Sequence, residues 1–568
     1  MAKDSTALLE QLEGVFPDFE FTVMLSREGK QIFELLDDAW IVSALRPILL
    51  IHDRVEVVLS SRDDEPMMNP SEEQRPFATV YEGGAEVGVI TAQRRSDVPL
   101  KRIMVVVPTR DLVKTPSNFM MKLNTSKVAS MVATTYTKLY YAMPLTLDVY
   151  RQFRNTNGRG KPPKVYPAMK RAGDEGGDLN SKTMWIAMHW AESGGAESWA
   201  WEQARIAHDA GFNLVFTFDR CAPQRALNLA SELSDDIYLI DQSVPRRDWP
   251  ALVVEFMEKH RPGFVHVHHS MFVYHMLPLI KSLYPHLHVE DSTHIAEHRG
   301  GGFVATSIGA KEFVDLHHVI SPQLQRLYDE GAVDPVKVVF RPLTSFTSDQ
   351  SEPKPVLIDS SRPVRLGFLG RLSPQKRPVL FLALAAFLNK RYPGRFEFIM
   401  QGSGELEGVV QQQIKRMRLE NVVQRRGWGP TKDFFDDVDI LVLTSENEGL
   451  TLTTIEADAE GVLVVSTDVG SQETVIAPGA LLPREPIQFF NEARKLFPRL
   501  LNEPGFIAKL ARDQRAQLNH LRSLESASEF FTNHYQEILG SIEAPQGQER
   551  PEHEAGPQQD GQSQEGES

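Results

Sequence analysis

The stretch DILVLTSENEGLTLTTIEA, residues 439–457, sets the pattern from which the rest of the chain can be interpreted. Its apolar run ILVL predicts a short buried strand, and the polar residues that follow predict a loop. Gly449 permits an unusual backbone in that loop, and we expect a helix to begin near Thr451. A strand, a loop with acidic side chains and a helix are together the repeating unit of an α/β domain with a parallel sheet.

The same alternation extends outward from this stretch. Strands are predicted at VRLGFLG (364–370), FEFIMQG (396–402), VVQRRGW (422–428) and VLVVSTD (462–468), with helix-length segments between them. An earlier series has the same order: MWIAMHW (184–190), NLVFTF (213–218), IYLI (237–240) and FVHVHH (264–269). We therefore predict two doubly wound α/β domains facing a cleft, at 183–345 and 363–522, and a closing helix at 523–543.

A different pattern precedes these domains. Strand-like runs rich in Val, Ile and Phe occur at FEFTVML (20–26), RVEVVLS (54–60), AEVGVIT (85–91) and KRIMVVVP (101–108). Residues 1–14 are expected to form a short amphipathic helix or a frayed end. The sequence thus predicts a β-rich accessory module over 1–154 and a Gly- and Pro-rich linker over 155–182. A Gln- and Glu-rich tail over 544–568 is predicted to be disordered.

Composition narrows the classes of protein. The 568 residues carry a formal net charge of −15, which argues against nonspecific nucleic-acid binding. Cys221 is the single cysteine, so an intrachain disulfide framework and a multi-cysteine metal site are excluded, and a reducing compartment is favoured. The longest apolar run, 378–388, is well short of the ~20 residues that a membrane-spanning helix needs. We expect a cytoplasmic protein; peripheral membrane contact stays open.

Ligands of doubly wound sheets bind beyond the carboxyl ends of the strands, so the residues there are the candidates for a site. The stretch GRLSPQK (370–376) places Arg371 and Lys376 in one loop, just before a helix that starts near Pro378. Two cations and a helix N-terminus can reach one anion, and the combination suits a diphosphate. The alternative is a pair of solvated loop cations.

Glu448 and Glu456 stand eight residues apart after the strand 439–445. Glu448 is expected in the loop facing the cleft, and Glu456 one to two turns into the helix. The two carboxylates would then contact different parts of one extended ligand; the alternative is that both are simply solvated. Tight turns are indicated at QGSGE (401–405), which contains Gly402, and at STDVGSQET (466–474), which contains Glu473.

Taken in order, these motifs resemble the donor-binding domain of retaining glycosyltransferases of family 4, which have the GT-B architecture. The first α/β half resembles the other domain of that family. It has Gly194 and Gly195 in ESGGAES (192–198), histidines in VHVHHS (265–270) and His294 in EDSTHIAEHRGGGF (290–303). The resemblance covers about 183–540 and does not include the N-terminal module.

The resemblance implies a mechanism. The donor would be a nucleotide-diphosphate sugar, and Arg371 and Lys376 would stabilise the departing diphosphate in place of a metal ion. Glu448 would hold donor-sugar hydroxyls, Glu456 the ribose hydroxyls, and His294 the donor sugar or the acceptor. Retention would follow a front-face route without a protein nucleophile, and domain closure would exclude water. The further donor-binding residues that it implies are Gly194, Gly195, Gly370, Gly402, Gly449, Leu450 and Thr451.

Several alternatives remain open at this stage. The acceptor is a glycan, a cell-surface polymer, a lipid-linked sugar or a protein, and the N-terminal module either recognises it or mediates oligomerisation. The rival functions are a nucleotide-sugar epimerase or phosphorylase and a catalytically silent GT-B scaffold. No cofactor or metal is expected, and DVD (437–439) is interpreted as structural because it enters an apolar strand. The histidines interpreted mostly as strand-end or surface groups, with a zinc site as the minor alternative, are His266, His268, His269, His317 and His318.

Four positions depart from what the resembling family often has. They are Arg377 (often Gly), Thr451 (often Pro), Asp458 (often Met) and Leu463 (often Pro). None of them removes a charged ligand, so activity is still expected, but they weaken any inference about which donor is used.

Overall fold

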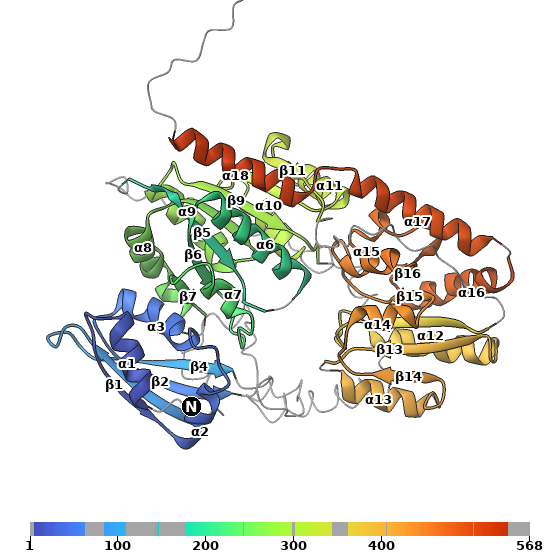
Figure 1. The fold of residues 1–568 in the computed structure, drawn as a ribbon, viewed down its shortest axis with the longest axis horizontal. Helices are drawn as coiled ribbons and strands as arrows, with labels where there is room; N and C mark the ends of the chain where they lie inside the picture. Colours follow the sequence, from blue (N-terminus) through green and yellow to red (C-terminus); the bar gives the residue numbers. More distant parts are fainter. Residues whose placement is uncertain are drawn as a thin grey trace, which may run out of the picture.

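The computed structural model describes residues 5–62, 85–108, 143, 145–146, 178–192, 194–241, 243–297, 301–343, 362–404, 406–503 and 505–543. Within them the strands form three sheets, one in an N-terminal module and one in each of two α/β domains (Figure 1). The predictions for the tail 544–568 and for most of the linker concern segments outside the described residues. The expectation of two doubly wound α/β domains preceded by a β-rich module is confirmed.

The N-terminal module is a four-stranded mixed sheet in the order β1-β3-β2-β4. Its β3 pairs antiparallel with β1 and β2, and β4 pairs parallel with β2. The elements are α1 (Ser5–Val15), β1 (Glu20–Leu25), α2 (Arg27–Phe33), α3 (Trp40–Ile51), β2 (Arg54–Arg62), β3 (Ala85–Gln93) and β4 (Lys101–Pro108). All four strands lie where the alternation predicted them.

The helices α2 and α3 were not predicted. The sequence of α3, WIVSALRPILLI, is apolar almost throughout and contains Pro47, so neither its period nor its Pro pointed to a helix. Tertiary burial explains the outcome, because nine of its twelve residues are buried. The helix packs against β7 and α8 of the next domain, and Arg46 adds an ion pair with Asp236 at 3.1 Å. The module is therefore docked on the first α/β domain (Figure 1).

The first α/β domain has a seven-stranded sheet, all parallel, in the order β11-β10-β9-β8-β5-β6-β7. Its strands are β5 (Asn180–Met188), β6 (Asn213–Phe218), β7 (Ile237–Leu239), β8 (Pro262–His268), β9 (His288–Thr293), β10 (Leu316–Val319) and β11 (Val338–Phe340). Its helices are α6 (Gly195–Ala210), α7 (Leu227–Ser231), α8 (Trp249–His260), α9 (Met271–Leu283), α10 (Gly302–Gly309) and α11 (Pro322–Glu330), with 3-10 turns at Arg246–Asp248 and Pro335–Lys337. β5 begins at Asn180, inside the predicted linker, because it pairs with β8 from that residue on.

The second α/β domain has a six-stranded parallel sheet in the order β14-β13-β12-β15-β16-β17. Its strands are β12 (Val364–Leu369), β13 (Phe396–Gln401), β14 (Val423–Arg426), β15 (Ile440–Leu443), β16 (Leu463–Thr467) and β17 (Leu481–Leu482). Its helices are α12 (Pro378–Arg391), α13 (Glu407–Arg416), α14 (Thr431–Asp436), α15 (Leu452–Ala459), α16 (Pro486–Asn502) and α17 (Phe506–Arg522), with 3-10 turns at Gln472–Thr474 and Pro478–Ala480.

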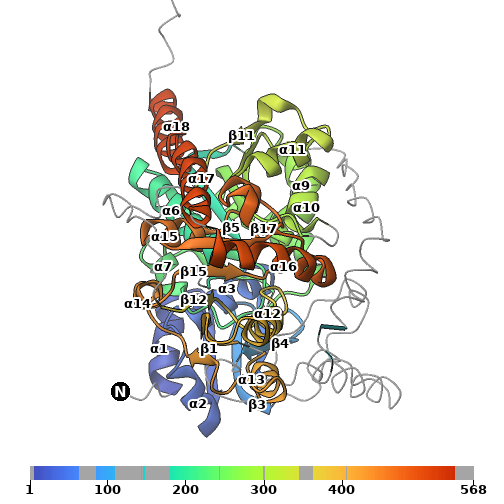
Figure 2. The ribbon, with the colours of Figure 1, turned by 90° about the vertical axis from the view of Figure 1, so that its right-hand side faces the viewer.

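The last helix, α18 (Ala527–Glu543), leaves the second α/β domain and returns to the first (Figures 1 and 2). It packs against α6, and Phe531 and Tyr535 are fully buried there. The predicted closing helix thus belongs to the core of the first domain while following the second in sequence. No helix in the described ranges has both the length and the apolar character needed to cross a bilayer.

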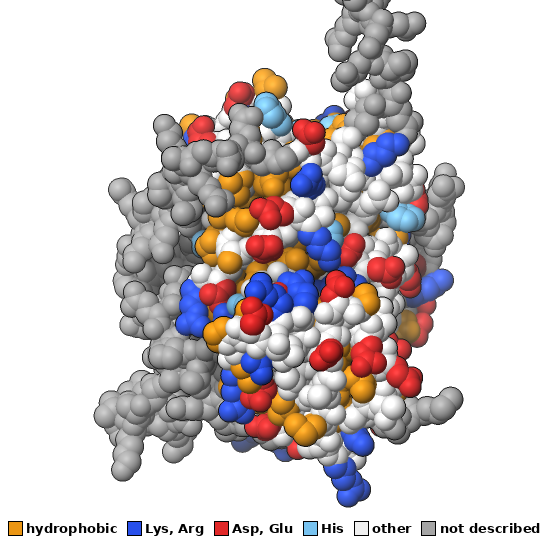
Figure 3. All heavy atoms as spheres, turned by 90° about the vertical axis from the view of Figure 1, so that its left-hand side faces the viewer, with side chains coloured by type: hydrophobic (Ala, Val, Ile, Leu, Met, Phe, Trp, Pro, Cys, Tyr) orange, Lys and Arg blue, Asp and Glu red, His pale blue; other side chains and the backbone are white. Residues whose placement is uncertain are grey.

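One face of the molecule, formed on the side of the N-terminal module and the first α/β domain, carries charges of both signs (Figure 3). Lys and Arg side chains gather near the middle of this face, with Asp and Glu side chains among and around them. Ion pairs are a general feature of this half of the chain, for example Arg94 with Asp53 and Lys101 with Asp248.

Candidate active site

The strand order reverses once in each α/β sheet, and the candidate site residues lie at these reversals. In the first sheet the chain runs outward from β5 through β6 to β7 and then resumes on the other side of β5 with β8. In the second sheet the reversal falls between β12 and β15. Parallel sheets bind their ligands at such switch points, beyond the carboxyl ends of the strands. The loops after β5, β8, β12 and β15 are therefore the candidate ligand-binding loops.

In the second domain the loops after β12 and β15 are hydrogen-bonded to each other. The amide of Glu446 donates to the carbonyl of Gln375 at 2.7 Å, and the Gln375 side chain donates to the carbonyl of Asn447 at 3.0 Å. The hydroxyl of Thr444 donates to the carbonyl of Lys376 at 2.9 Å. These bonds fix the predicted cation loop and the predicted glutamate loop as one unit.

Lys376 and Glu448 form the centre of that unit. Lys376 Nζ lies 2.6 Å from Glu448 Oε1, and Ser445 also donates its hydroxyl proton to this oxygen. The Glu448 side chain is 7% exposed and that of Lys376 is 28% exposed. The sequence reasoning assigned the two residues to different parts of a ligand, but in this structure they are paired directly.

Two glycines make this arrangement possible by admitting a close backbone approach. Gly470 has φ 55°, and a Cβ built there would lie 1.8 Å from the carbonyl oxygen of Glu448. Gly402 has φ 135°, and a Cβ there would lie 2.0 Å from the carbonyl oxygen of Gly370. Both positions exclude any larger residue, since no real side chain tolerates such contacts. Gly402 therefore serves the contact between two loops.

Gly449 has a different role from the one expected. Its φ is not positive, so the left-handed region does not explain it. Instead, a Cβ on Gly449 would lie 2.4 Å from the carbonyl oxygen of His294 in the other α/β domain. The glycine allows the two domains to touch at this point, and it brings the Glu448 loop against the segment that carries His294.

Further contacts join the two domains around this point. Ser321 and Ser471 share a hydrogen bond of 2.6 Å between their hydroxyls, and Arg326 is paired with Glu473. On the other side, a Cβ on Gly195 would lie 3.7 Å from the side chain of Leu452 at the start of α15. The N-terminus of α6 in one domain therefore faces the N-terminus of α15 in the other.

His294 is buried at this junction. It is 3% exposed, and neither of its ring nitrogens has a hydrogen-bond partner in the described part of the chain. Burial, reinforced by the neighbouring histidine His269, lowers its pKa well below the usual value. The imidazole is thus neutral, and both of its nitrogens are available to a ligand.

Histidines that the sequence reasoning did not select share this environment. His189 follows β5, and His269 follows β8 with φ 61°, a strained backbone for a residue with a side chain. The ring centroids of His269 and His294 are 5.3 Å apart, and those of His189 and His269 are 5.6 Å apart. The signal that would have found His189 was its place directly after the first strand of the domain.

Glu197 anchors the loop beside this histidine cluster. It lies in the first turn of α6 and accepts hydrogen bonds from Trp190 Nε1 at 2.6 Å and from His189 Nε2 at 3.1 Å. Burial alone would raise its pKa, but these bonds and the charge of His189 outweigh it and lower the pKa to about 2. Glu197 therefore stays ionised and orients His189.

The remaining predicted residues of this domain belong to the same two loops and to α15, and none of them is paired with Lys376 or Glu448. Arg371 has an exposed side chain, and the described residues offer it no hydrogen bond or ion pair. Glu456 lies in the second turn of α15, half-buried, and burial raises its pKa. Leu450 and Thr451 are buried, and the Thr451 hydroxyl accepts a hydrogen bond from Gln472.

Gly194 caps α6 with an extended backbone and, like Gly195 beside it, lies near the domain junction. Gly370 has φ 147°, and a Cβ there would lie 3.9 Å from the Lys376 side chain. Gly194 thus lies in the loop after β5, and Gly370 lies in the loop after β12.

Residues 363–498 match the family model described as "Glycosyl transferases group 1". This segment is therefore similar to group 1 glycosyl transferases. It contains the loops after β12 and β15, with Arg371, Lys376, Glu448 and Glu456. At the level of group 1 glycosyl transferases, the resemblance stated for the motifs is confirmed for this part of the chain.

Curated relatives match part of the chain. A D-inositol 3-phosphate glycosyltransferase of Streptomyces avermitilis is 34% identical over 124 residues, which are 20% of this chain and 26% of the relative. An undecaprenol-linked GalNAc α-1,4-N-acetyl-D-galactosaminyltransferase of Campylobacter jejuni is 31% identical over 98 residues, 16% of this chain and 25% of the relative. The chain thus spans about a quarter of the length of these relatives.

Two solved structures are among those to which the chain is similar. Anabaena HepE in complex with UDP and glucose has 16% identity and a TM-score of 0.47, and the match covers 63% of this chain and 100% of that chain. The lipopolysaccharide outer core galactosyltransferase WaaB in its apo form has 16% identity and a TM-score of 0.47, covering 63% and 99%.

One expectation about side chains near the site needs correction. The five histidines interpreted mostly as strand-end or surface groups are all buried, because β8, β9 and β10 are interior strands of the sheet: His266, His268, His269, His317 and His318. Most of them bond within the core; for example, His317 bonds Asp291 at 2.9 Å. They are parts of a buried polar network.

Two of the four departures from the family pattern, Arg377 and Asp458, have structural explanations. Arg377 takes φ 51° at the start of α12, and its guanidinium donates to the carbonyl of Arg484 at 2.8 Å. A left-handed backbone explains why glycine is common at this position. Asp458 is fully buried, and its Oδ2 forms an ion pair with Nε of Arg515 at 2.8 Å. In the segment DVD (437–439), Asp439 Oδ2 pairs with Nη1 of Arg362 at 2.7 Å. This ion pair agrees with the interpretation of DVD as a structural segment.

Proposed function

We propose that the protein is a retaining glycosyltransferase that moves a sugar from a nucleotide-diphosphate sugar to a hydroxyl acceptor without a metal ion at the reacting bond. The observation that carries the proposal is the juxtaposition at the domain junction. Glu448, paired with Lys376 at the switch point of one sheet, is followed by Gly449, which abuts the backbone of His294 from the other domain. The neutral imidazole of His294 has no hydrogen-bond partner among the described residues. The matching family model and the relatives' names support the same activity.

Lys376 would stabilise the negative charge that develops on the leaving diphosphate. Its ammonium group is already positioned by the carboxylate of Glu448 at 2.6 Å, so little reorganisation is needed when a donor binds. Arg371, in the same loop and exposed, supplies a planar fork for a second phosphate oxygen. The N-terminus of α12 adds partial positive charge on the same side.

Glu448 would accept hydrogen bonds from hydroxyls of the donor sugar through the oxygen that Lys376 does not occupy. Glu456 would accept those of the ribose. Burial raises the pKa of Glu456, and no described side chain pairs with it, so bidentate bonds from two hydroxyls would stabilise its ionised form. Glu448 and Glu456 would therefore bind different parts of the donor, the sugar and the ribose.

His294 would contact the donor sugar from the facing domain. A neutral imidazole donates one hydrogen bond and accepts another, which suits a sugar hydroxyl. In a front-face reaction the acceptor oxygen attacks the anomeric carbon, the bond to the phosphate oxygen breaks, and that phosphate oxygen takes the acceptor's proton. No protein nucleophile is needed, and we assign none.

Lys376→Ala tests the proposal. We expect wild-type protein to show a higher melting temperature with one of UDP, GDP or ADP, and this shift to be largely lost in the variant. Transfer should fall by about 10²–10³-fold, the usual effect of removing one group that stabilises developing charge. Lys390→Ala is the matched control, because Lys390 is an exposed lysine in the last turn of α12.

Product analysis separates the proposal from its rivals. The wild type is incubated with the identified donor, with and without hydroxyl acceptors, and the anomeric configuration of the product is read by NMR. A retained linkage with full activity after chelation supports the proposal. An epimerised donor without transfer, an inverted product, or wild-type turnover by Lys376→Ala would each contradict it. So would loss of activity with EDTA at an unchanged melting temperature that a divalent ion restores.

A further inference from the structure

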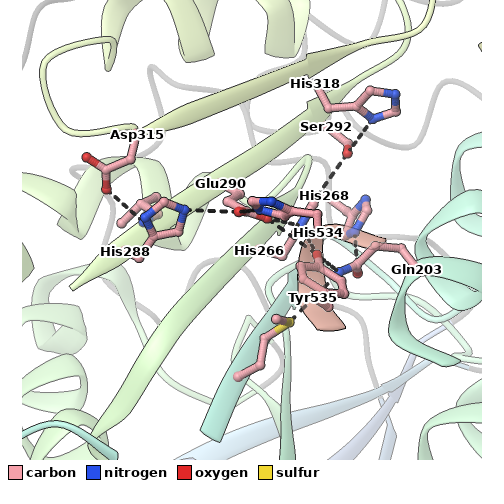
Figure 4. Close-up of polar contacts among 12 residues, drawn as sticks. Gln203, His266, His268, His288, Glu290, Ser292, Asp315, His318, His534 and Tyr535 are labelled. Atoms are coloured by element: carbon pink, nitrogen blue, oxygen red, sulfur yellow. Dashed lines mark hydrogen bonds and ion pairs between the residues drawn. The ribbon is translucent and has the colours of Figure 1, made fainter. Parts of the chain in front are cut away.

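A second cluster of ligand-type side chains lies away from the domain junction, where α18 meets β9. His288, Glu290 and His534 each offer one metal-binding atom there, and these atoms all lie within 4.8 Å of one another (Figure 4). Glu290 and His534 are 244 residues apart in the chain and meet because α18 returns to the first α/β domain. The proposed glycosyl transfer makes no use of this cluster.

The backbone presents the three side chains toward one point. His288 and Glu290 are two residues apart on β9, so their side chains emerge on the same face of the sheet. His534 approaches that face from α18. Glu290 Oε1 lies 3.0 Å from His288 Nε2 and 2.6 Å from His534 Nε2. Both imidazoles therefore aim the same ring nitrogen at the same carboxylate oxygen.

The other oxygen of Glu290 is held by separate groups. Oε2 lies 3.3 Å from His266 Nδ1 and 3.4 Å from the hydroxyl of Tyr535, and both of these residues are buried. Such contacts fix the orientation of a carboxylate and leave one oxygen for a metal ion, as outer-shell partners do in metalloproteins. Figure 4 shows Glu290 between His288 on one side and His266 and Tyr535 on the other.

Accessibility permits entry of an ion. The Glu290 side chain is 3% exposed, whereas those of His288 and His534 are 34% and 24% exposed. The cluster is thus buried on the carboxylate side and open to solvent on the imidazole side. An ion could enter and keep water as a further ligand, as zinc does in sites with three protein ligands.

We propose that His288, Glu290 and His534 bind a divalent transition-metal ion of the zinc type, through the two Nε2 atoms and Oε1, and that the ion fastens α18 to β9. Two imidazoles and one carboxylate are a recognised ligand set for Zn²⁺, at about 2.0–2.2 Å from the metal. The ligand atoms need to separate by only some tenths of an ångström to admit it. Metal binding displaces the protons that now join the nitrogens to Oε1.

The site is structural, because it lies at the opposite end of β9 from the proposed reaction. His288 begins the strand, whereas His294 follows its last residue, and five steps along a strand span roughly 16 Å. No metal is expected anywhere from the sequence, so this site departs from that expectation, whereas the proposed transfer still uses no metal at the reacting bond. The histidines that the sequence considered for zinc are different ones.

Metal-stripped full-length protein is titrated with Zn²⁺ by calorimetry, and with Co²⁺ while the visible spectrum is recorded. We expect one equivalent of each ion to bind, with the absorption of four- or five-coordinate Co²⁺, and the melting temperature to rise with Zn²⁺. His288→Ala and His534→Ala should each weaken Zn²⁺ binding at least about tenfold and abolish the Co²⁺ bands. His286→Ala is the matched control, an exposed histidine in the turn before β9.

Two results would overturn the proposal. Absence of stoichiometric binding by the wild type would show that the three residues are only a hydrogen-bonded clasp. Equal binding by His288→Ala and His534→Ala would place the metal elsewhere on the chain. His288→Ala guards against a folding artefact, because His288 is at the exposed start of the strand and its loss should leave α18 docked, as circular dichroism can verify. Nucleotide binding by the same variants should be unchanged, which separates this test from that of the proposed transfer.

Discussion

Glu448 shows how much of the candidate site depends on single residues. Its carboxylate is paired with Lys376 and Ser445, and its carbonyl oxygen lies where a side chain at position 470 would be. The carboxylate cannot move without breaking a nearly buried ion pair, which is costly because one charge would be left unpaired. A substitution at Gly470 should therefore disturb the site without removing any charged group.

Gly470→Ala tests this at the residue scale. Gly470 has φ 55°, and the added Cβ would lie 1.8 Å from the Glu448 carbonyl oxygen. Gly505 has φ 79° with nothing within 4 Å of its Cβ, so Gly505→Ala carries the backbone strain alone. We expect Gly505→Ala to cost about 1–2 kcal/mol in the free energy of unfolding. Gly470→Ala should cost clearly more and also weaken nucleotide binding.

Denaturant titration and nucleotide thermal shifts measure the two effects. Equal destabilisation of the two glycine variants, with nucleotide binding intact in both, would show that the loop yields easily and that the close approach does not hold Glu448.

At the scale of elements, α18 unites parts of the chain that are distant in sequence. Phe531 lies between the rings of Trp199, His266 and His318 and is fully buried, whereas its neighbour Phe530 is only partly buried. Comparing variants of Phe531 and Phe530 therefore separates the effect of packing on the first domain from the general effect of removing an aromatic residue in this helix.

Phe531→Ala is expected to destabilise the protein by about 3–5 kcal/mol, the usual cost of removing a buried Phe side chain. Phe530→Ala should cost much less, because its ring already faces solvent in part and stacks under Arg341 at 4.8 Å. Chemical denaturation gives the two free energies, and limited proteolysis reports whether α18 detaches. Similar costs for both variants would show that α18 is not fastened through Phe531.

At the scale of the whole molecule, buried neutral histidines make the stability depend on pH. Burial, together with the neighbouring His266, lowers the pKa of His318 to about 4; Asp291 and the hydrogen bond to the Arg341 carbonyl oppose this, while the Arg341 charge adds to it. The unfolded chain has a histidine pKa near 6.5 and so binds a proton at a higher pH than the folded protein does. Stability is therefore full above about pH 6.5 and is lost as the pH falls from there toward 4.

His318 alone should remove about 2 kcal/mol of stability between pH 7 and pH 5. His318→Gln cannot be protonated, so its free energy of unfolding should fall less over the same interval. Chemical denaturation at pH 7, 6 and 5 measures both slopes. Parallel slopes for wild type and variant would show that His318 does not carry this dependence.

Much of the fold and part of the site could be predicted from the chain. The alternation of apolar runs and amphipathic segments located β5 to β8 and β12 to β16 within a few residues, because parallel strands are buried on both faces. It did not locate β9, β10, β11 and β17. Polar residues directly after those strands identified the loops of Lys376 and Glu448. By contrast, α3 was missed because a nearly uniform apolar run has no period. His189 and His269 were missed because their position beside His294 depends on which strands are neighbours.

The amino-acid sequence by itself indicated the order of most of the strands, the resemblance of residues 363–498 to group 1 glycosyl transferases and the loops that carry charge. Those properties are local, since they follow from spacing and residue type within about twenty positions. Only the tertiary structure decided that Lys376 faces Glu448, that Gly449 abuts His294 and that His534 reaches Glu290. These contacts join residues far apart in the chain, and the burial that creates them has no periodic trace in the sequence.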